Sequence, residues 1–278
     1  MEWEKAKNLI LIFFILLNVV LAAFMLGERR RYTVTAEHEA VIRNVLAQHD
    51  ITFDTEMIRR FPPMRALLMS GYYYDEDALL GMFFPESQLP QRSEYDWGIS
   101  FTHGASELAI ANGYVVYTNP HGMADTPAAF IRRHFPDFVL DEYDERFVHN
   151  DEDGEWMIFR QVYRGFTVYS NYIQFHVTDA GIEEVIMIFG HIHGRDGPQR
   201  PIFAPDEALI TFLHVMHRFA PEQPVTIWHM DIVYFTEFDN AGTEYGSIHH
   251  AVPFYRIFTR EFEIPFLINA YLNMSIDV

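Results

Sequence analysis

Two histidines separated by one residue, His191 and His193, have the type and spacing that come nearest to a metal site. Alternate residues of a strand point to the same face, so both imidazoles of Gly190-His191-Ile192-His193 would approach one ion. A dinuclear metal hydrolase also needs upstream DxH, GDxxD and GNH[DE] motifs, and none of them occurs in this sequence. We therefore expect a polar strand end here, followed by a turn at residues 194–198.

Two further segments begin like metal sites and then depart from the pattern. His38-Glu39 starts like the zinc motif HExxH, but Ile42 stands where the second histidine is required. The acidic segment from Asp151 to Glu155 resembles a calcium loop, yet Trp156 occupies the sixth position, where an EF-hand needs glycine. We expect Glu39 to lie at an ordinary helix N-terminus and the acidic segment to form a solvated hairpin turn.

Motifs for nucleophilic catalysis and phosphate binding are absent from the sequence, which has no GxSxG, no GxxxxGK[ST] and no cysteine. Ser106 and Ser247 have no recognisable triad context. A pH-sensing role for His249 and His250 is an alternative to incidental surface histidines. The sequence thus predicts no catalytic residue, no metal and no cofactor, and the protein is expected not to be an enzyme.

The longest apolar run covers residues 9–26, LILIFFILLNVVLAAFML. Eighteen residues form a helix of about 27 Å, close to the roughly 30 Å of a bilayer core, so the run predicts a transmembrane helix. A cleaved signal peptide is the alternative, but no Ala-x-Ala site follows the run. Asn18, in the middle of the run, is a candidate contact to another transmembrane helix. The other interpretation is that its amide faces lipid or bonds its own backbone.

We expect a single-pass protein of the cell membrane with a cytoplasmic N-terminus and an extracytoplasmic body. The flanking charges leave the orientation open, because Lys5 and Lys7 precede the run and Arg29, Arg30 and Arg31 follow it. Long downstream domains translocate largely regardless of charge, and a chain without cysteine suits an extracytoplasmic setting. The net charge of −19 repels phosphates, so nucleic acids are not expected as partners.

Start signals followed by helical spacing predict helices from Thr35, from Thr126 and from Ala204. The segment Thr35 to Glu39 is interpreted as a capping box, and Pro127 follows a polar cap candidate. Between these helices, aromatic and β-branched residues alternate with polar ones. Hairpin turns are expected at Asn112-Gly113, Arg164-Gly165 and Asp179-Ala180-Gly181. The predicted strands lie at residues 66–75, 107–119, 155–178, 181–193, 225–235, 252–260 and 265–271.

This order predicts an α+β chain, with an N-terminal transmembrane helix followed by two small domains of antiparallel sheet with few covering helices. We place the short cytoplasmic N-terminus and anchor at residues 1–31. The first extracytoplasmic domain is expected at residues 32–123 and the second at residues 124–278. The acidic stretch at residues 141–155 is the alternative boundary.

The N-terminal segment MEWEKAKNLILIFFILLNVVLA resembles the start of the YycI (WalI) family, whose members open with Met, an acidic or polar residue and Trp. Lysines and an apolar run containing Leu-Asn then follow. Later segments are similar in the same order, at residues 161–166, 172–175, 204–213, 252–257 and 268–271. Tyr255 departs from the family pattern where Trp is expected, and residues 32–123 carry the least resemblance.

The resemblance implies a non-enzymatic, membrane-anchored regulator related to YycH. Such proteins associate with YycH and with WalK, the sensor histidine kinase of the WalK/WalR (YycG/YycF) two-component system for cell-wall homeostasis in Gram-positive bacteria. Asn18 and the helix face around it would then pack against kinase transmembrane helices, while the extracytoplasmic sheets bind a YycH-like partner or the kinase. The alternatives are a PepSY-like inhibitor or chaperone of a secreted peptidase and, third, a metal-dependent hydrolase that uses His191 and His193.

Overall fold

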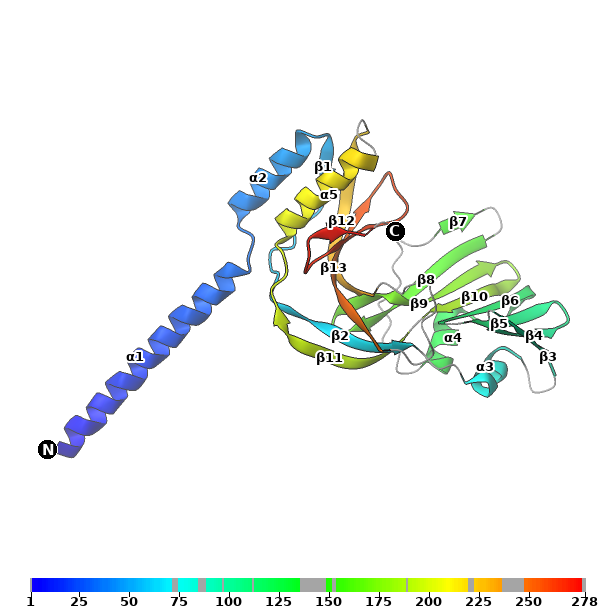
Figure 1. Ribbon diagram of the computed structural model, residues 1–278, viewed down its shortest axis with the longest axis horizontal. Helices are drawn as coiled ribbons and strands as arrows, with labels where there is room; N and C mark the ends of the chain where they lie inside the picture. Colours follow the sequence, from blue (N-terminus) through cyan, green and yellow to red (C-terminus); the bar gives the residue numbers. More distant parts are fainter. Residues whose placement is uncertain are drawn as a thin grey trace. The chain divides into compact units, whose positions relative to one another are not determined.

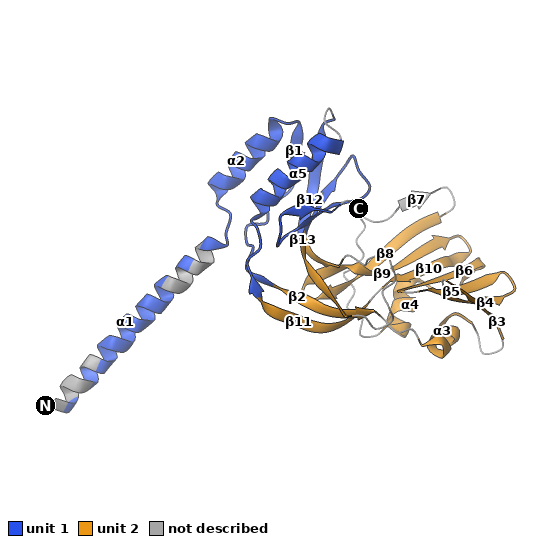
Figure 2. Cartoon of the chain, in the orientation of Figure 1, with its two compact units in different colours: residues 1–64, 199–231, 255–278 blue, residues 65–198, 232–254 orange. Residues whose placement is uncertain are grey.

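The computed structural model describes residues 2–71, 75–84, 89–96, 98–111, 113–135, 149–151, 154–188, 190–219, 223–236 and 248–276 (Figure 1). The chain divides into two compact units, each assembled from separate segments (Figure 2). Unit 1 comprises residues 1–64, 199–231 and 255–278, and unit 2 comprises residues 65–198 and 232–254. The boundary expected after residue 123 falls inside unit 2.

Unit 1 combines helices with short strands. Its helices are α1 (Glu2–Arg31), α2 (Ala36–Ala47) and α5 (Pro205–Phe219). Its strands are β1 (Ile51–Phe53), β14 (Phe266–Asn269), β15 (Met274–Ser275), the first part of β12 (Val225–Phe235) and the last part of β13 (Ile248–Thr259). Helix α2 packs against β1 and α5, and α5 also contacts β14 and β15 (Figure 1).

The local sequence explains where α2 begins. The Thr35 hydroxyl accepts a hydrogen bond from the His38 amide at 3.3 Å, which satisfies one of the free N–H groups of the first turn. The capping-box interpretation needs correction, because the third helical position holds His38 and no glutamate. Glu39, one residue later, pairs instead with Arg43.

Helix α5 has the apolar face that the sequence predicts. Ala208, Leu209, Phe212, Leu213 and Met216 recur at three and four residues and are all buried. Glu207 lies in the first turn, and its carboxylate accepts a hydrogen bond from the Ala204 amide at 2.7 Å. The helix is therefore fixed to unit 1 by one apolar stripe and by an acidic first turn.

Unit 2 contains α3 (Glu76–Phe83), α4 (Pro127–His134) and most of the strands. These are β2 (Met64–Gly71), β3 (Gln91–Tyr95), β4 (Gly98–His103), β5 (Ser106–Ala111), β6 (Tyr114–Met123), β7 (His149–Asp151), β8 (Gly154–Tyr163), β9 (Phe166–Thr178), β10 (Gly181–Ile188) and β11 (Gly190–Arg200). Strands β9, β10, β6, β5, β4 and β3 are neighbours in that order, and each adjacent pair is antiparallel.

Two predicted hairpin turns occur where the glycines predict them. Arg164 and Gly165 both have positive φ, 51° and 83°, and join β8 to β9 as a two-residue turn between Tyr163 and Phe166. Gly181 has φ 114°, and a Cβ atom there would lie 2.3 Å from the Met123 carbonyl oxygen. Only glycine fits this close approach of β10 to the end of β6.

The core of unit 2 lies between the two short helices and the antiparallel sheet. Phe83 of α3 and Phe130 of α4 pack with their ring centroids 5.7 Å apart, and Phe130 meets Phe175 of β9 edge to face at 5.6 Å. All three side chains are at most 4% exposed. This aromatic cluster is the layer that positions the pocket described below.

The predicted fold class of two small antiparallel domains is wrong. The described strands pair into one 15-stranded sheet that is mixed. Strand β1 runs parallel to β12 over Ile51–Phe53, and Tyr234 of β12 is paired in parallel with Val168 of β9. Alternation along one segment shows which face of a strand is buried, but it carries no information about the direction of a neighbour more than 60 residues away.

The predicted membrane anchor also needs correction. Within the residues that the structure describes, no helix combines the length and the apolar character that crossing a membrane requires. The predicted span, residues 9–26, lies within α1 (Glu2–Arg31). The side chains of residues 9 and 24–26 lie outside the part that the structure describes. The transmembrane helix and the single-pass location in the cell membrane are therefore overturned as predictions.

Candidate functional site

A pocket of about 610 Å³ opens in unit 2 between the end of α3, the turn from β4 to β5, and β6. Its size is within the range of small-ligand sites in proteins. The end of α3 contributes Met82, and Phe84 directly follows the helix. His103 and Ser106 come from the adjoining ends of β4 and β5, and Tyr117 comes from β6. The walls therefore combine apolar side chains with a few groups that can form hydrogen bonds.

The apolar side of this pocket is held by stacked rings. Tyr117 lies against Phe83 with the centroids 4.4 Å apart and the planes 19° apart, and Phe84 meets Tyr117 edge to face at 5.9 Å. Burial raises the pKa of the Tyr117 hydroxyl, and hydrogen bonds with Ser106 and Asn119 oppose that shift only in part. Tyr117 therefore stays protonated at neutral pH and keeps a hydrogen to donate.

A smaller pocket of about 230 Å³ shares Met82, Met123 and Ala124 with the first one. Its other side is formed by α4, where Phe130 is buried and Arg133 forms an ion pair with Asp125 at 2.8 Å. Because the two pockets share three residues, they form one continuous depression along α3 and the end of β6. We call this depression the α3 groove.

A strongly perturbed carboxylate lies elsewhere, in unit 1. The Arg256 guanidinium is 1% exposed and forms a two-point ion pair with Asp231, in which its Nε lies 2.9 Å from the carboxylate. Burial alone would raise the pKa of Asp231, but hydrogen bonds from His229 and Arg256 and the charge of Arg256 lower it to about 2. An ionised carboxylate held on both oxygens accepts hydrogen bonds and does not act as a base near neutral pH.

Unit 2 has an uncharged counterpart to this ion pair. The Asn171 side chain is fully buried and bonds both backbone groups of Gly190, donating to the carbonyl oxygen at 2.9 Å and accepting from the amide at 3.0 Å. Its amide nitrogen also donates to Gln161 at 2.7 Å. One amide thus ties β9 to the start of β11 and to β8.

The two histidines with metal-like spacing do lie together. The rings of His191 and His193 face one another with centroids 4.8 Å apart, and His193 Nε2 lies 2.9 Å from the Ser70 hydroxyl of β2. No group of three or more potential metal ligands occurs among the described residues. The prediction that both imidazoles share a face is confirmed, and His193 bonds a serine. The turn expected at residues 194–198 is wrong, because β11 (Gly190–Arg200) continues through it.

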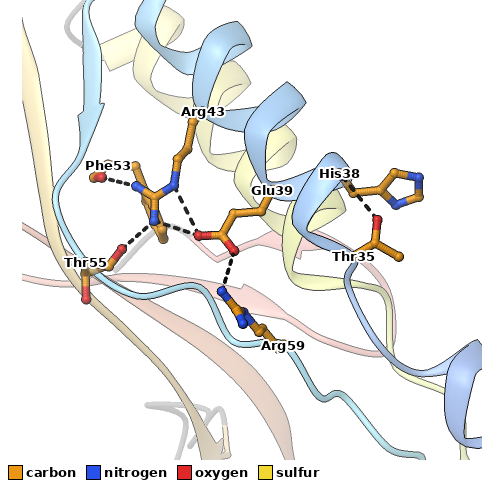
Figure 3. Close-up of polar contacts among 7 residues, drawn as sticks. All are labelled: Thr35, His38, Glu39, Arg43, Phe53, Thr55 and Arg59. Carbon is orange, nitrogen blue, oxygen red and sulfur yellow. Dashed lines mark hydrogen bonds and ion pairs between the residues drawn. The ribbon is translucent and has the colours of Figure 1, made fainter.

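Glu39 is part of a clamp at the start of unit 1, shown in Figure 3. Arg43 pairs with Glu39 at 2.9 Å and donates to the carbonyl oxygens of Thr55, at 2.7 Å, and of Phe53. Its guanidinium also lies 4.6 Å from the centroid of the Phe53 ring. Arg59 approaches the other Glu39 oxygen at 3.5 Å. These contacts fix α2 to the segment after β1 and occupy the Glu39 carboxylate.

The remaining predicted positions are separated in the structure. Asn18 donates to the Phe14 carbonyl oxygen of its own helix at 2.8 Å, which matches the backbone-bonding interpretation of its amide. His250 Nε2 lies 2.8 Å from Asp196, and hydrogen bonding from His250 lowers the pKa of that carboxyl. Ser106 lines the α3 groove. Glu152, Asp153 and Ser247 lie outside the described residues.

Sequence reasoning missed the α3 groove, although one of its signals is present. Asp75 accepts hydrogen bonds from the amides of Asp77 and Ala78, and Leu79 and Phe83 follow at helical spacing, so a cap and an apolar face both mark α3. The strand predicted at residues 66–75 included the cap residue Asp75, so no helix was predicted after it. No local signal indicates that α3 packs beside the turn from β4 to β5.

Comparison with known proteins gives a similarity of fold and indicates no activity. No family model matches the chain, and no curated protein matches it. The structure is similar to the crystal structure of an uncharacterized protein from Eubacterium rectale, with a TM-score of 0.50 and 8% sequence identity. The similarity covers 82% of this chain and 90% of the other. At this identity the likeness concerns the fold alone.

Proposed function

We propose that this chain is a non-enzymatic regulatory protein that binds a sensor histidine kinase of the WalK type together with a YycH-like partner. The proposal rests on one observation: the segments that resemble YycI lie at buried positions of the structure. Residues 252–257 lie in β13, where Phe254, Tyr255 and Ile257 are at most 1% exposed and Arg256 pairs with Asp231. Buried, paired residues specify a fold, so a resemblance at these positions is a resemblance between folds.

The other similar segments also lie at positions that build the units. Gln161 of β8 accepts the hydrogen bond from buried Asn171, and α5 contributes the apolar stripe of unit 1. Ile268 and Ala270, near the C-terminus, are fully buried. The resemblance therefore follows the internal structure of both units, which supports assignment to a regulator with this architecture.

Helix α1 offers the surface for the partner. Its described apolar side chains are exposed, with Phe13 at 62% and Leu16 at 63%, and exposed apolar patches of this extent mark interaction sites. The partner is expected to contribute a helix whose apolar face packs along α1. Such a contact regulates the kinase only if it binds one kinase state more tightly than the other.

The test uses the full chain and a purified WalK-like kinase, with binding and autophosphorylation measured together. We expect Phe13→Asp to weaken kinase binding at least about tenfold, because it places a charge in the apolar contact. Val41→Asp is the matched control, since Val41 is 57% exposed on α2 and outside this surface. Equal binding by both variants, or an autophosphorylation rate that the chain leaves unchanged, would refute the proposal.

A second measurement separates the proposal from the peptidase alternative. A tagged full chain is cross-linked in cells, and the captured proteins are identified by mass spectrometry. Recovery of the histidine kinase and a YycH-like protein with the original chain, and their loss with Phe13→Asp, supports the proposal. Recovery of a secreted peptidase with both chains would replace it with the PepSY-like inhibitor.

A further inference from the structure

We infer that the α3 groove of unit 2 is a binding site for a small uncharged amphipathic molecule with an apolar ring or branched body and an amide or hydroxyl edge. The inference rests on the groove alone and is independent of the proposed regulatory function. Its main pocket, about 610 Å³, is large enough to hold such a molecule, and the adjoining 230 Å³ extends the space toward α4.

The residues that the two pockets share indicate that part of the ligand is apolar. Met82 and Met123 lie at their junction, and methionine side chains adapt to irregular apolar shapes. Phe84 and the stack of Phe83 on Tyr117 form an aromatic surface beside them. A planar or branched apolar group fits against these walls better than a flexible polar chain.

The polar part of the ligand is assigned by the polar side chains that line the same pocket. His103 and Ser106 on the turn from β4 to β5, and Asn119 and His121 on β6, present groups that donate or accept hydrogen bonds. Asn119 is already engaged, since it accepts from the His121 amide at 3.1 Å and donates to the Gly122 carbonyl oxygen at 3.3 Å. The imidazoles of His103 and His121 are therefore the groups placed to meet an amide or a hydroxyl.

The charge of the ligand follows from the composition of the pocket. Among the residues that the structure describes, no aspartate, glutamate, lysine or arginine lines the main pocket, although the chain contains 59 such residues. In the adjoining pocket Arg133 and Asp125 already neutralise one another. A charged ligand would lose hydration without gaining an ion pair, and an anion would also be repelled by the net charge of −19.

The test compares three probes that share a four-carbon chain ending in a phenyl ring and differ in charge: 4-phenylbutyramide, 4-phenylbutyrate and 4-phenylbutylammonium. Binding to the full chain is measured by ligand-observed NMR at neutral pH. We expect the amide to bind with a Kd of about 2 mM or tighter, which is ordinary for a ligand of this size. The two charged probes should bind at least about fivefold more weakly. No detectable binding of the amide, or equal binding of all three probes, would overturn the inference.

Two tryptophan variants locate the binding. Ala124 is exposed and borders both pockets, so Ala124→Trp fills their junction and should weaken amide binding at least about fivefold. Ala36→Trp is the matched control, because Ala36 is exposed on α2 in unit 1 and far along the chain from the groove. Both variants keep the exposed apolar residues of α1, to which the probe could also bind. If both variants lose binding equally, or both retain it, the probe binds outside the groove.

His121→Ala is a second variant that does not depend on filling space. It removes one imidazole from the lining of the groove. We expect it to weaken binding of 4-phenylbutyramide while leaving the weak binding of the two charged probes unchanged. The control is His38→Ala on α2, since His38 is also exposed. Unchanged amide affinity in both His121→Ala and Ala124→Trp would refute the site.

Discussion

The two units each bury a polar side chain that ties strands together, and they do so by opposite chemical means. Unit 1 uses a charged pair, Arg256 with Asp231, whereas unit 2 uses the neutral amide of Asn171. Both arrangements link β-strands through residues that are at most 25 positions apart in the sequence. The contrast teaches that register can be fixed by charge or by an amide, and that only the charged version makes stability depend on pH.

Breaking the charged pair should have the largest effect. Asp231→Ala leaves the Arg256 guanidinium buried without its carboxylate, and the free energy of unfolding should fall by about 3 to 5 kcal/mol. The measurement is urea unfolding followed by circular dichroism. Asp54→Ala is the control, because the Asp54–Arg260 pair is exposed and should contribute about 0 to 1 kcal/mol. Equal losses in the two variants would mean that burial of the pair is not what matters.

Removing the amide in unit 2 should cost less but still a large amount. Asn171→Ala leaves the Gly190 amide and carbonyl without their side-chain partner, and we expect a loss of about 2 to 4 kcal/mol. Asn44→Ala on α2 is the matched control, since Asn44 is exposed and its carbonyl bonds along the helix. Hydrogen exchange of β9 and β11 should show where stability is lost. Unchanged protection in those strands would contradict the role given to Asn171.

Acid should distinguish the two arrangements. The pKa of Asp231 is about 2 in the folded chain against an ordinary value of 3.8, so its stabilisation is present above the ordinary value and is lost as pH falls toward 2. Complete protonation removes about 2 kcal/mol, of which about 1 kcal/mol is lost by pH 3. The comparison is unfolding at pH 6 and pH 3 for the original chain, Asn171→Ala, and Asp231→Leu with Arg256→Met. The double variant alone should have a shallower dependence on pH, and an identical slope in all three would refute the assignment.

The smallest expected effect compares one helix start in each unit. Thr35 caps α2 and Thr126 caps α4, each accepting a backbone N–H at 3.3 Å. Thr35→Ala and Thr126→Ala should each destabilise by about 1 kcal/mol, and Thr→Ser at either position should restore most of it. Unfolding measured by hydrogen exchange shows whether each loss stays within its own unit. A loss below about 0.3 kcal/mol at both sites would show that these caps do not stabilise the helices.

Local structure could be predicted from the sequence wherever one segment carries its own signal. The apolar stripe of α5, the caps Thr35 and Thr126, and the turn Arg164-Gly165 all appear where the residues indicate them. Helix α3 also carries a cap and an apolar face, and it was missed because a strand was assigned over its start. The shared face of His191 and His193 follows from strand periodicity alone.

What the sequence could not show depends on long-range pairing. The parallel pair of β1 and β12 joins Ile51 to Val225, and no local pattern gives that partner. The same holds for Asp231 and Arg256, which are unremarkable as separate residues and perturbed only once β12 and β13 bring them together. The α3 groove likewise arises from packing between α3 and a turn about 20 residues later. Sites of this kind are set by topology, which periodicity does not encode.

Because the two units are built from interleaved segments, neither unit can be separated from the other by cutting the chain at one point. Unit 1 needs three stretches of sequence and unit 2 needs two, and β12 and β13 each pass from one unit to the other. Any continuous fragment that holds all of unit 2 therefore also holds residues 199–231 of unit 1. To produce either unit alone, its separate segments would have to be joined by new linkers. A single crossover between two related genes therefore cannot exchange one unit and leave the other unchanged.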